Sequence, residues 1–418
     1  MAGLDVTSWL LFLSVLINQM GRVLVPAIKT KVMKDAAMGT EFTDKVGLLL
    51  SAVSIVCLGG KFLGAAVTDK LGGWLVLIAV FAIWIVATIG AVIASTVDLF
   101  GYAWLLNSFA YTITWGAVVQ VIGANYGDQE RPAELAKASS ASRFGATIGN
   151  IVFGQLLSAG LTWRQVCMPM VPLQAVLLLM CIYKWNANKA AAAAPAAKKA
   201  DGKKADEPPP TSIVGAVLSI DFWLMLIPKA VLFTYTQFFM NYIPQLLNVQ
   251  YGYDDGMAAT LGGVAQGGSV VGLLVVGNMF YKSLDKTNKV YLVFLLLALC
   301  ATAPFALSLG PTVLPKAAVV PLTCLWGLAY ALPFYIPPGE FAMQIGGKSS
   351  TALFTNMFDA AGFGMSAVWN PWASSIAKTG DFKVVLQSQA IFGAISMLCM
   401  PLCMYRQNAK AAAAKKKE

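Results

Sequence analysis

Helix-length apolar segments follow one another along almost the whole chain of 418 residues, and only short polar stretches separate them. A helix that crosses a bilayer needs about 20 mainly apolar residues. Hydrophobic residues make up 58% of this chain and charged residues only 12%, which is more apolar surface than a soluble protein of this length needs. The sequence therefore predicts an all-α integral membrane protein that crosses the bilayer many times.

Twelve apolar segments can be placed along the chain. They lie near residues 7–29, 46–68, 74–95, 99–123, 141–160, 165–184, 213–247, 258–281, 290–309, 316–337, 350–373 and 384–404. Residues 188–212 read NKAAAAAPAAKKADGKKADEPPPTS, and this Ala, Lys and Pro content without an aromatic residue is typical of a flexible linker. We therefore expect twelve transmembrane helices in two six-helix bundles, over residues 1–187 and 213–405, followed by a basic tail over residues 406–418.

The distribution of Lys and Arg predicts the orientation in the membrane. If the linker is cytoplasmic, the connections on its side also hold Lys70, Arg131, Lys137, Lys282, Lys286, Lys289 and Lys348. Positively charged loops stay in the cytoplasm, so both termini are expected there too. Residues 29–45 are an exception, because they place four lysines on the opposite side, beside three acids. Ten of the thirty bases behind the net charge of +10 lie in 189–204 and 406–417, next to helices, which argues against nucleic-acid binding.

Several kinds of chemistry are missing from the sequence. The chain contains no histidine, which excludes imidazole metal ligands, Ser-His-Asp triads and histidine proton relays. The seven cysteines fall in or beside apolar segments without the spacing of metal ligands, so we expect them to be small core residues. The chain also lacks a Gly-x-x-x-x-Gly-Lys-Ser/Thr nucleotide loop. We therefore expect neither an enzyme nor a bound cofactor or metal.

Arg22 lies inside the first apolar segment, in the stretch LINQMGRVLVP of residues 16–26. An arginine at the centre of a bilayer costs at least ~2.5–3.5 kcal/mol, so such a residue usually faces a protein interior or an aqueous cavity. Ser14, Asn18 and Arg22 share one helical face because they are four residues apart. Arg22 is therefore a candidate ligand-binding residue, and the alternative is a structural ion pair with an acid.

A second polar stripe, on the fifth apolar segment, also contains an arginine. Arg143, Thr147 and Asn150 lie on one face of that predicted helix. Lys61 lies inside the second segment and either reaches the same site or extends to the membrane surface. Arginine suits an anion site because its planar fork binds phosphate or carboxylate with two parallel hydrogen bonds and stays charged.

The second half of the chain places acids where the first half places arginines. Asp359 belongs to a polar stripe of the eleventh segment, whereas Glu340 follows the helix-breaking stretch PFYIPPGE at 333–340. Asp359 lies deeper and is expected to pair with a cation of the first half or to bind an ammonium group of the substrate. Glu340 either titrates during transport or lies near the cytoplasmic end of its helix. Gln237 and Asn241 share a polar face of the seventh segment and are suited to hydrogen-bond a ligand.

The stretch GAAVTDKLGG at 64–73 closes the second apolar segment. Small residues such as Gly64 allow tight helix contacts, and Gly72 and Gly73 allow a sharp reversal. Asp69 is placed to cap or pair at the ends of neighbouring helices, next to Lys70. The stretch resembles the loop signature of the major facilitator superfamily, Gly-x-x-x-Asp-Lys/Arg-x-Gly-Gly/Arg, and it stands between the second and third helices as it does in that family.

Two further stretches support this resemblance. GNMFYKSLDK at 277–286 resembles a degraded second copy of the loop signature, and GDQERPAELAKASSASR at 127–143 resembles the acidic-basic stretch between helices four and five. The resemblance implies two pseudo-symmetric bundles that alternate access to a site near the middle of the membrane. It also implies that the protein works as a monomer.

Within the superfamily, the stretches GRVLVPAIKTK at 21–31 and DKVGLLLSAVSIVCLGGKFLGAAVTDKLGG at 44–73 look most like the organophosphate/phosphate antiporters. This resemblance implies that Arg22 binds a substrate phosphate and that Lys61 corresponds to a lysine of helix two. Two positions depart from the pattern, because Thr236 stands where a second phosphate-binding arginine is expected, and Arg143 stands where one bacterial member has a histidine.

These observations predict a secondary transporter that moves a small organic anion, with a phosphate ester exchanged for phosphate as the example that the resemblance suggests. The expected binding residues are Arg22, Arg143, Lys61, Asn18, Asn150, Tyr111, Gln237 and Asn241. A proton-coupled symporter of a carboxylate or zwitterion, which would use Asp359 or Glu340, and a membrane receptor that does not transport remain alternatives. The expected partners are the anionic solute and the lipid bilayer.

Overall fold

The computed structural model describes residues 5–127, 130–193 and 213–415, and every regular element in this part of the chain is a helix. The first half contains α1 (Val6–Met33), α2 (Gly39–Leu71), α3 (Gly73–Ile93), α4 (Val97–Asn125), α5 (Arg131–Ser158), the short α6 (Trp163–Cys167) and α7 (Met170–Ala193). These helices match the six apolar segments that the sequence predicts there. The break between α6 and α7 is the one addition.

The second half contains more helices than the sequence predicts. It holds α8 (Ile213–Val217), α9 (Ile220–Asn241), α10 (Ile243–Val249), α11 (Asp255–Val271), a π-helix over Gly272–Phe280, α12 (Lys286–Leu307), α13 (Lys316–Ala377) and α14 (Lys383–Lys415). The single helix expected over 213–247 is therefore wrong. Ser219 caps the start of α9, and Tyr242 separates α9 from α10, which has Pro244 in its first turn. Proline lacks the N–H that a continuous helix would need at this point.

Helix α13 spans 62 residues and contains five prolines, but it does not run straight. The ring centroids of Phe341 and Phe358 lie 6.1 Å apart, whereas a straight helix would separate these positions by about 26 Å at 1.5 Å per residue. The chain therefore reverses between them. This reversal gives the two antiparallel arms expected over 316–337 and 350–373.

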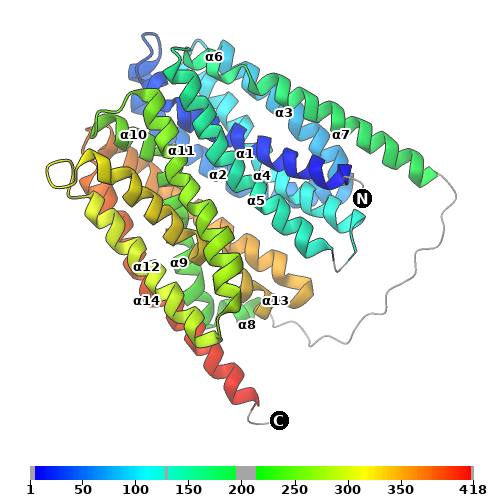
Figure 1. Cartoon of the computed structure of the whole chain (residues 1–418). Helices are drawn as coiled ribbons and strands as arrows, with labels where there is room; N and C mark the ends of the chain where they lie inside the picture. Colours follow the sequence, from blue (N-terminus) through cyan, green and yellow to red (C-terminus); the bar gives the residue numbers. More distant parts are fainter. Residues whose placement is uncertain (1–4, 128–129, 194–212, 416–418) are drawn as a thin grey trace.

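The described part contains ten helices that are long and apolar enough to cross a membrane. Helix α5 and the second arm of α13 are more polar and bring the number to the twelve that the sequence predicts. Figure 1 shows α1–α7 gathered on one side of the molecule and α8–α14 on the other. The all-α, twelve-helix prediction is confirmed.

The two halves contact each other in a way that reveals their pseudo-symmetry. Helix α5 packs along α11, and α2 packs along the second arm of α13. Exchanging the two halves maps α2 onto α11, which is the eighth predicted helix. It also maps α5 onto the second arm of α13, which is the eleventh predicted helix. The contact of α5 with α11 is therefore equivalent to the contact of α2 with the second arm of α13. Glycines allow the close approach, because a Cβ on Gly154 would collide with the backbone of α11, and a Cβ on Gly47 would lie 2.8 Å from Cβ of Ser374.

Polar contacts close one end of the interface between the halves. Lys29 of α1 donates hydrogen bonds to the backbone oxygen of Asn241 and to Oε1 of Gln245, and the second of these measures 2.8 Å. At the same end, Nζ of Lys34 lies 2.7 Å from Oδ1 of Asp255. The halves are therefore joined where α1 ends and α11 begins.

Candidate functional site

A cavity of about 480 Å³ lies between the two halves. Residues from α1, α2, α4, α5, α9, α11 with its π-helical continuation, and α13 line it. The lining residues Ala136, Ser139 and Thr355 are exposed, so the cavity opens at the end opposite the closed contact. Small-molecule sites in proteins commonly have this size.

Arg22 reaches the cavity from α1. Its Nη1 donates a 2.6 Å hydrogen bond to the hydroxyl of Tyr111 on α4, and its Cζ lies 4.3 Å from the centre of the same ring. Tyrosine orients the guanidinium by this contact without neutralising it. The other N–H groups of Arg22 remain available for a ligand, because the described residues provide it with no other hydrogen bond or ion pair.

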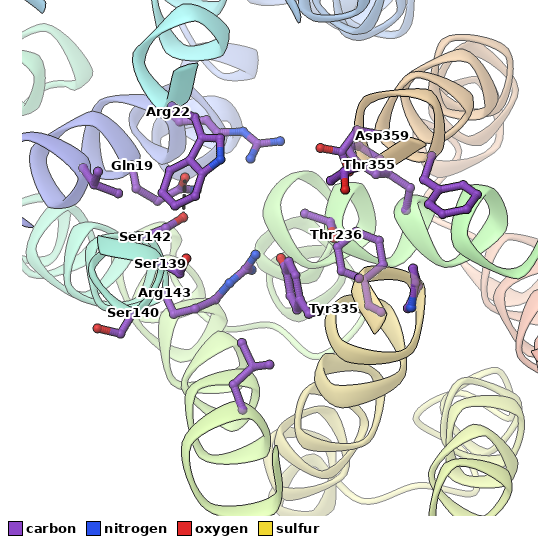
Figure 2. Close-up of a pocket in the computed structure, with 18 of the residues that line it drawn as sticks. Gln19, Arg22, Ser139, Ser140, Ser142, Arg143, Thr236, Tyr335, Thr355 and Asp359 are labelled. Carbon is purple, nitrogen blue, oxygen red and sulfur yellow. Dashed lines mark hydrogen bonds between the residues drawn. The ribbon is translucent and has the colours of Figure 1, made fainter. Parts of the chain in front are cut away.

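Arg143 reaches the same cavity from α5. Its Cζ lies 4.2 Å from the ring centre of Tyr335, which belongs to the first arm of α13 and thus to the other half. Figure 2 shows Arg143 and Arg22 extending into the pocket from the same side. Within the described part of the chain, no carboxylate forms an ion pair with either arginine, so the acid partner considered as an alternative is not seen.

Asp359 lies between two lysines at the other side of the cavity. Its Oδ2 is 3.4 Å from Nζ of Lys61 on α2, and its Oδ1 is 3.5 Å from Nζ of Lys229 on α9. Asp359 therefore pairs with a cation of the first half, which is one of the two arrangements that the sequence left open. Lys61 points at this carboxylate and into the cavity rather than to the membrane surface, and only 16% of its side chain is exposed.

Lys229 is the main residue that the sequence interpretation missed. Its ammonium is buried, donates a 3.2 Å hydrogen bond to the backbone oxygen of Phe334, and lies 3.4 Å from the centre of the Phe334 ring. The signal was present, since Lys229 is a cation well inside the apolar segment 213–247. The same observation identified Arg22 as a candidate.

The cavity carries an excess of positive charge. Four cations line it, and among its described lining residues Asp359 is the only acid. The formal excess is three positive charges. Buried charge of one sign is costly when it is not compensated, so the site favours an anionic occupant.

Two buried side chains of the lining each have a polar atom without a hydrogen-bond partner. Nδ2 of Asn18 and Oγ1 of Thr236 have no hydrogen-bond partner among the described residues, and both side chains line the cavity. Gln19 is less available, because its Oε1 accepts a 3.2 Å hydrogen bond from Ser142.

Four predicted residues lie outside this cavity. Asn150 is buried against α11 and donates a 3.0 Å hydrogen bond to the backbone oxygen of Ala146. Gln237 and Asn241 bond to each other and line a separate space of about 20 Å³, which Arg22 and Tyr111 also border. Glu340 accepts a 2.9 Å hydrogen bond from the hydroxyl of Tyr281.

The glycines of residues 64–73 hold the closely packed turn between α2 and α3. Gly64 packs against Ile113 of α4, and a Cβ on Gly73 would collide with the backbone of Ala117. Gly72 has a φ of 83°, which favours glycine and reverses the chain. Lys70 is exposed. The side chain of Asp69 lies outside the described residues.

Comparisons with known proteins place this fold in a family. The family described as Major Facilitator Superfamily matches residues 10–378. The structure is similar to the crystal structure of a D-xylose-proton symporter, with a TM-score of 0.68, 13% identity, and coverage of 95% of this chain and 96% of that one. It is also similar to a mutant of the nucleoside transporter NupG, with a TM-score of 0.65, 15% identity, and coverage of 95% and 99%.

At these identities the two structures show the fold alone. A comparison with curated proteins gave no match. The family match covers most of the chain, including both halves and every helix that lines the cavity. The chain belongs to the Major Facilitator Superfamily, and it is a transporter rather than an enzyme.

Proposed function

We propose that this transporter moves a small organic anion and that Arg22 and Arg143 bind the anionic group. The observation that carries the proposal is the pair of arginines without an acid partner among the described residues, both directed into one cavity between the halves. A bound anion would supply the negative charge that the described lining residues do not provide to these arginines.

Transport follows from alternating access in this fold, because the two halves move about a central site. The cavity is closed at the end where Lys29 joins α1 to α9 and α10, and it opens at the other end. In the orientation that the loop charges predict, the open end faces the cytoplasm. Closing that end and separating the contacts of Lys29 would then expose Arg22 and Arg143 to the opposite side.

A second candidate is proton-coupled symport through Asp359. It is supported by the position of Asp359 in the cavity, where a carboxylate that gains a proton would weaken its contacts with Lys61 and Lys229. Glu340 lacks this support, because it lies outside the cavity. Exchange of two anions needs no such proton, so transport with and without a pH gradient separates the candidates.

Anion binding to the purified protein tests the proposal. We expect phosphate, phosphate esters or carboxylates to raise the melting temperature, and we expect Arg22→Gln and Arg143→Gln each to weaken binding by about thirtyfold or more, which corresponds to about 2 kcal/mol for a lost charged contact. Lys383→Gln is the control, because it removes a charge from an exposed site outside the cavity. Unchanged affinity in both arginine variants would refute the proposed site.

A further inference from the structure

We infer that the substrate carries two separate anionic groups, one held by Arg22 and Arg143 and the other by Lys61 and Lys229. This inference rests on the proposed anion transport and names its substrate class: short dicarboxylates, or phosphate esters that also carry a carboxylate. Its basis is the division of the four cations of the cavity into two groups.

The first group consists of the two arginines. Arg22 and Arg143 come from α1 and α5, and Figure 2 shows both on one side of the pocket with Asp359 on the other. Two positive charges in one cavity repel each other. Tyr111 and Tyr335 fix the two guanidinium groups through their rings and leave both charges in place. One phosphate or carboxylate would bridge this pair.

The second group consists of Lys61 and Lys229 around Asp359. The two ion pairs measure 3.4 and 3.5 Å, which is longer than the ~2.7–2.9 Å of a close hydrogen bond between charged groups. A single carboxylate also leaves one of the two lysine charges uncompensated. Both ammonium groups therefore keep donors and net charge for a second anionic group.

A substrate with a single negative charge would leave most of the excess positive charge of the cavity in place. The excess of three positive charges would fall only to two, and the lysine group would keep its own excess. A zwitterion fits less well, because an ammonium group would have to approach Asp359 beside two lysines that already face both carboxylate oxygens. A dianion lowers the positive charge of both groups at once and reduces the total excess from three to one.

The other residues that line the cavity indicate what joins the anionic ends. Phe233, Leu273 and Leu274 contribute apolar surface, while Asn18 and Thr236 contribute polar atoms without partners among the described residues. The connecting part is thus a short carbon chain with room for a hydroxyl group. A cavity of about 480 Å³ has space for a molecule of this kind.

Binding of paired ligands to the full-length protein tests the inference. Dicarboxylates of three to six carbons are compared with monocarboxylates of equal length at constant ionic strength, using calorimetry or melting temperature. We expect the best dicarboxylate to bind about tenfold or more tightly than its monocarboxylate. This comparison uses the unmodified protein and does not depend on the folding of a variant.

Variants then test whether Lys61 and Lys229 bind the second anionic group of the ligand. We expect Lys229→Gln and Lys61→Gln to reduce the preference for dicarboxylates to about twofold or less, while monocarboxylate binding stays within about twofold. Arg143→Gln should weaken both ligand series. Lys383→Gln is the control and should change neither.

Equal affinity for both series, or an equal loss of both in Lys229→Gln, would overturn the two-group inference while the proposed anion transport stands. Binding of neither series, nor of phosphate and its esters, would instead overturn the proposed function itself.

Discussion

Asp359 is the residue whose environment most strongly shapes the cavity, since it partly neutralises two lysines that come from different halves. Its removal tests whether it serves binding or coupling. We expect Asp359→Asn to bind anions as tightly as the unmodified protein or more tightly, because the excess of positive charge rises. We also expect transport to change, because the contact that joins Lys61 to the second half is lost.

Binding isotherms and uptake rates for Asp359→Asn over a range of pH check this prediction. A change in the pH profile would favour proton coupling, and an unchanged profile would favour exchange. Loss of anion binding as complete as that in Arg22→Gln would contradict the account, because Asp359 would then position the arginines.

At the scale of single residues, the sequence identified several residues that line the candidate site. Charges inside apolar segments identified Arg22, Arg143, Lys61 and Asp359, all of which line the cavity. The same criterion applies to Lys229 and would have found it. Helical periodicity alone could not tell that Asn150 faces α11, because it gives the residues that share a face and not the neighbour they contact.

At the scale of helices, the contact of Lys29 with the break between α9 and α10 is unusual. Lys29 is 2% exposed, bonds to Asn241 and Gln245, and lies 4.6 Å from the ring centre of Tyr242, with no acid partner in the described part. The last carbonyls of a helix carry partial negative charge, which favours a cation at this point. We interpret Lys29 as a contact that holds the closed end together.

We expect Lys29→Met to loosen the closed end, because a helix terminus would lose a charged hydrogen bond of about 1.5–3 kcal/mol. Hydrogen–deuterium exchange should become faster in Ile243–Val249 and at the start of α11. Lys383→Met is the control, since the side chain of Lys383 is exposed. Equal exchange in Lys29→Met and the unmodified protein would contradict this role.

The connection between α1 and α2 offers a test of stability outside the membrane-spanning helices. Oδ2 of Asp35 accepts a 2.8 Å hydrogen bond from Nε1 of Trp163, and Oδ1 accepts two more from the backbone of Ala37 and Met38. The hydrogen bond from Trp163 is the largest cause that lowers the pKa of Asp35 below its ordinary value of 3.8. Folding is therefore favoured more strongly when this carboxylate is ionised.

Since the pKa of Asp35 is lowered by folding, its contribution to stability is complete above the ordinary value and disappears as the pH falls through the folded value. We expect Asp35→Asn to lower the melting temperature at neutral pH, by an amount that corresponds to about 1 kcal/mol. The difference between variant and unmodified protein should shrink as the pH falls below 4. A difference that stays constant across this range would show that the charge of Asp35 is unimportant.

The positions of the helices were predicted closely where a long apolar segment forms one helix. The breaks inside the segment 213–247 had visible signals in Ser219 and Pro244. The prolines near residue 337 do not break α13, since they lie within the span Lys316–Gly346 and the chain reverses between Phe341 and Phe358. The π-helix over Gly272–Phe280 was not predictable. Gly272, where it begins, lies so close to the backbone of Leu328 that a Cβ would collide with it, and no local pattern encodes this contact.

At the scale of the whole molecule, the linker composition and the count of apolar segments predicted the division into six and six helices. The pairing of α5 with α11 and of α2 with α13 required the fold, because these helices are distant in sequence. The charge imbalance of the cavity also required the fold, since it emerges only when side chains from both halves share one space.

Counterflow in liposomes tests the central claim, that this cavity carries an organic anion by means of its arginines. Protein in liposomes loaded with an unlabelled dicarboxylate or phosphate ester is mixed with a trace of the same labelled compound outside. We predict rapid, saturable accumulation of label with the unmodified protein and Lys383→Gln, and none above empty liposomes with Arg22→Gln or Arg143→Gln. Accumulation of an uncharged sugar or nucleoside in place of every anion tested, or normal anion counterflow in both arginine variants, would contradict the account.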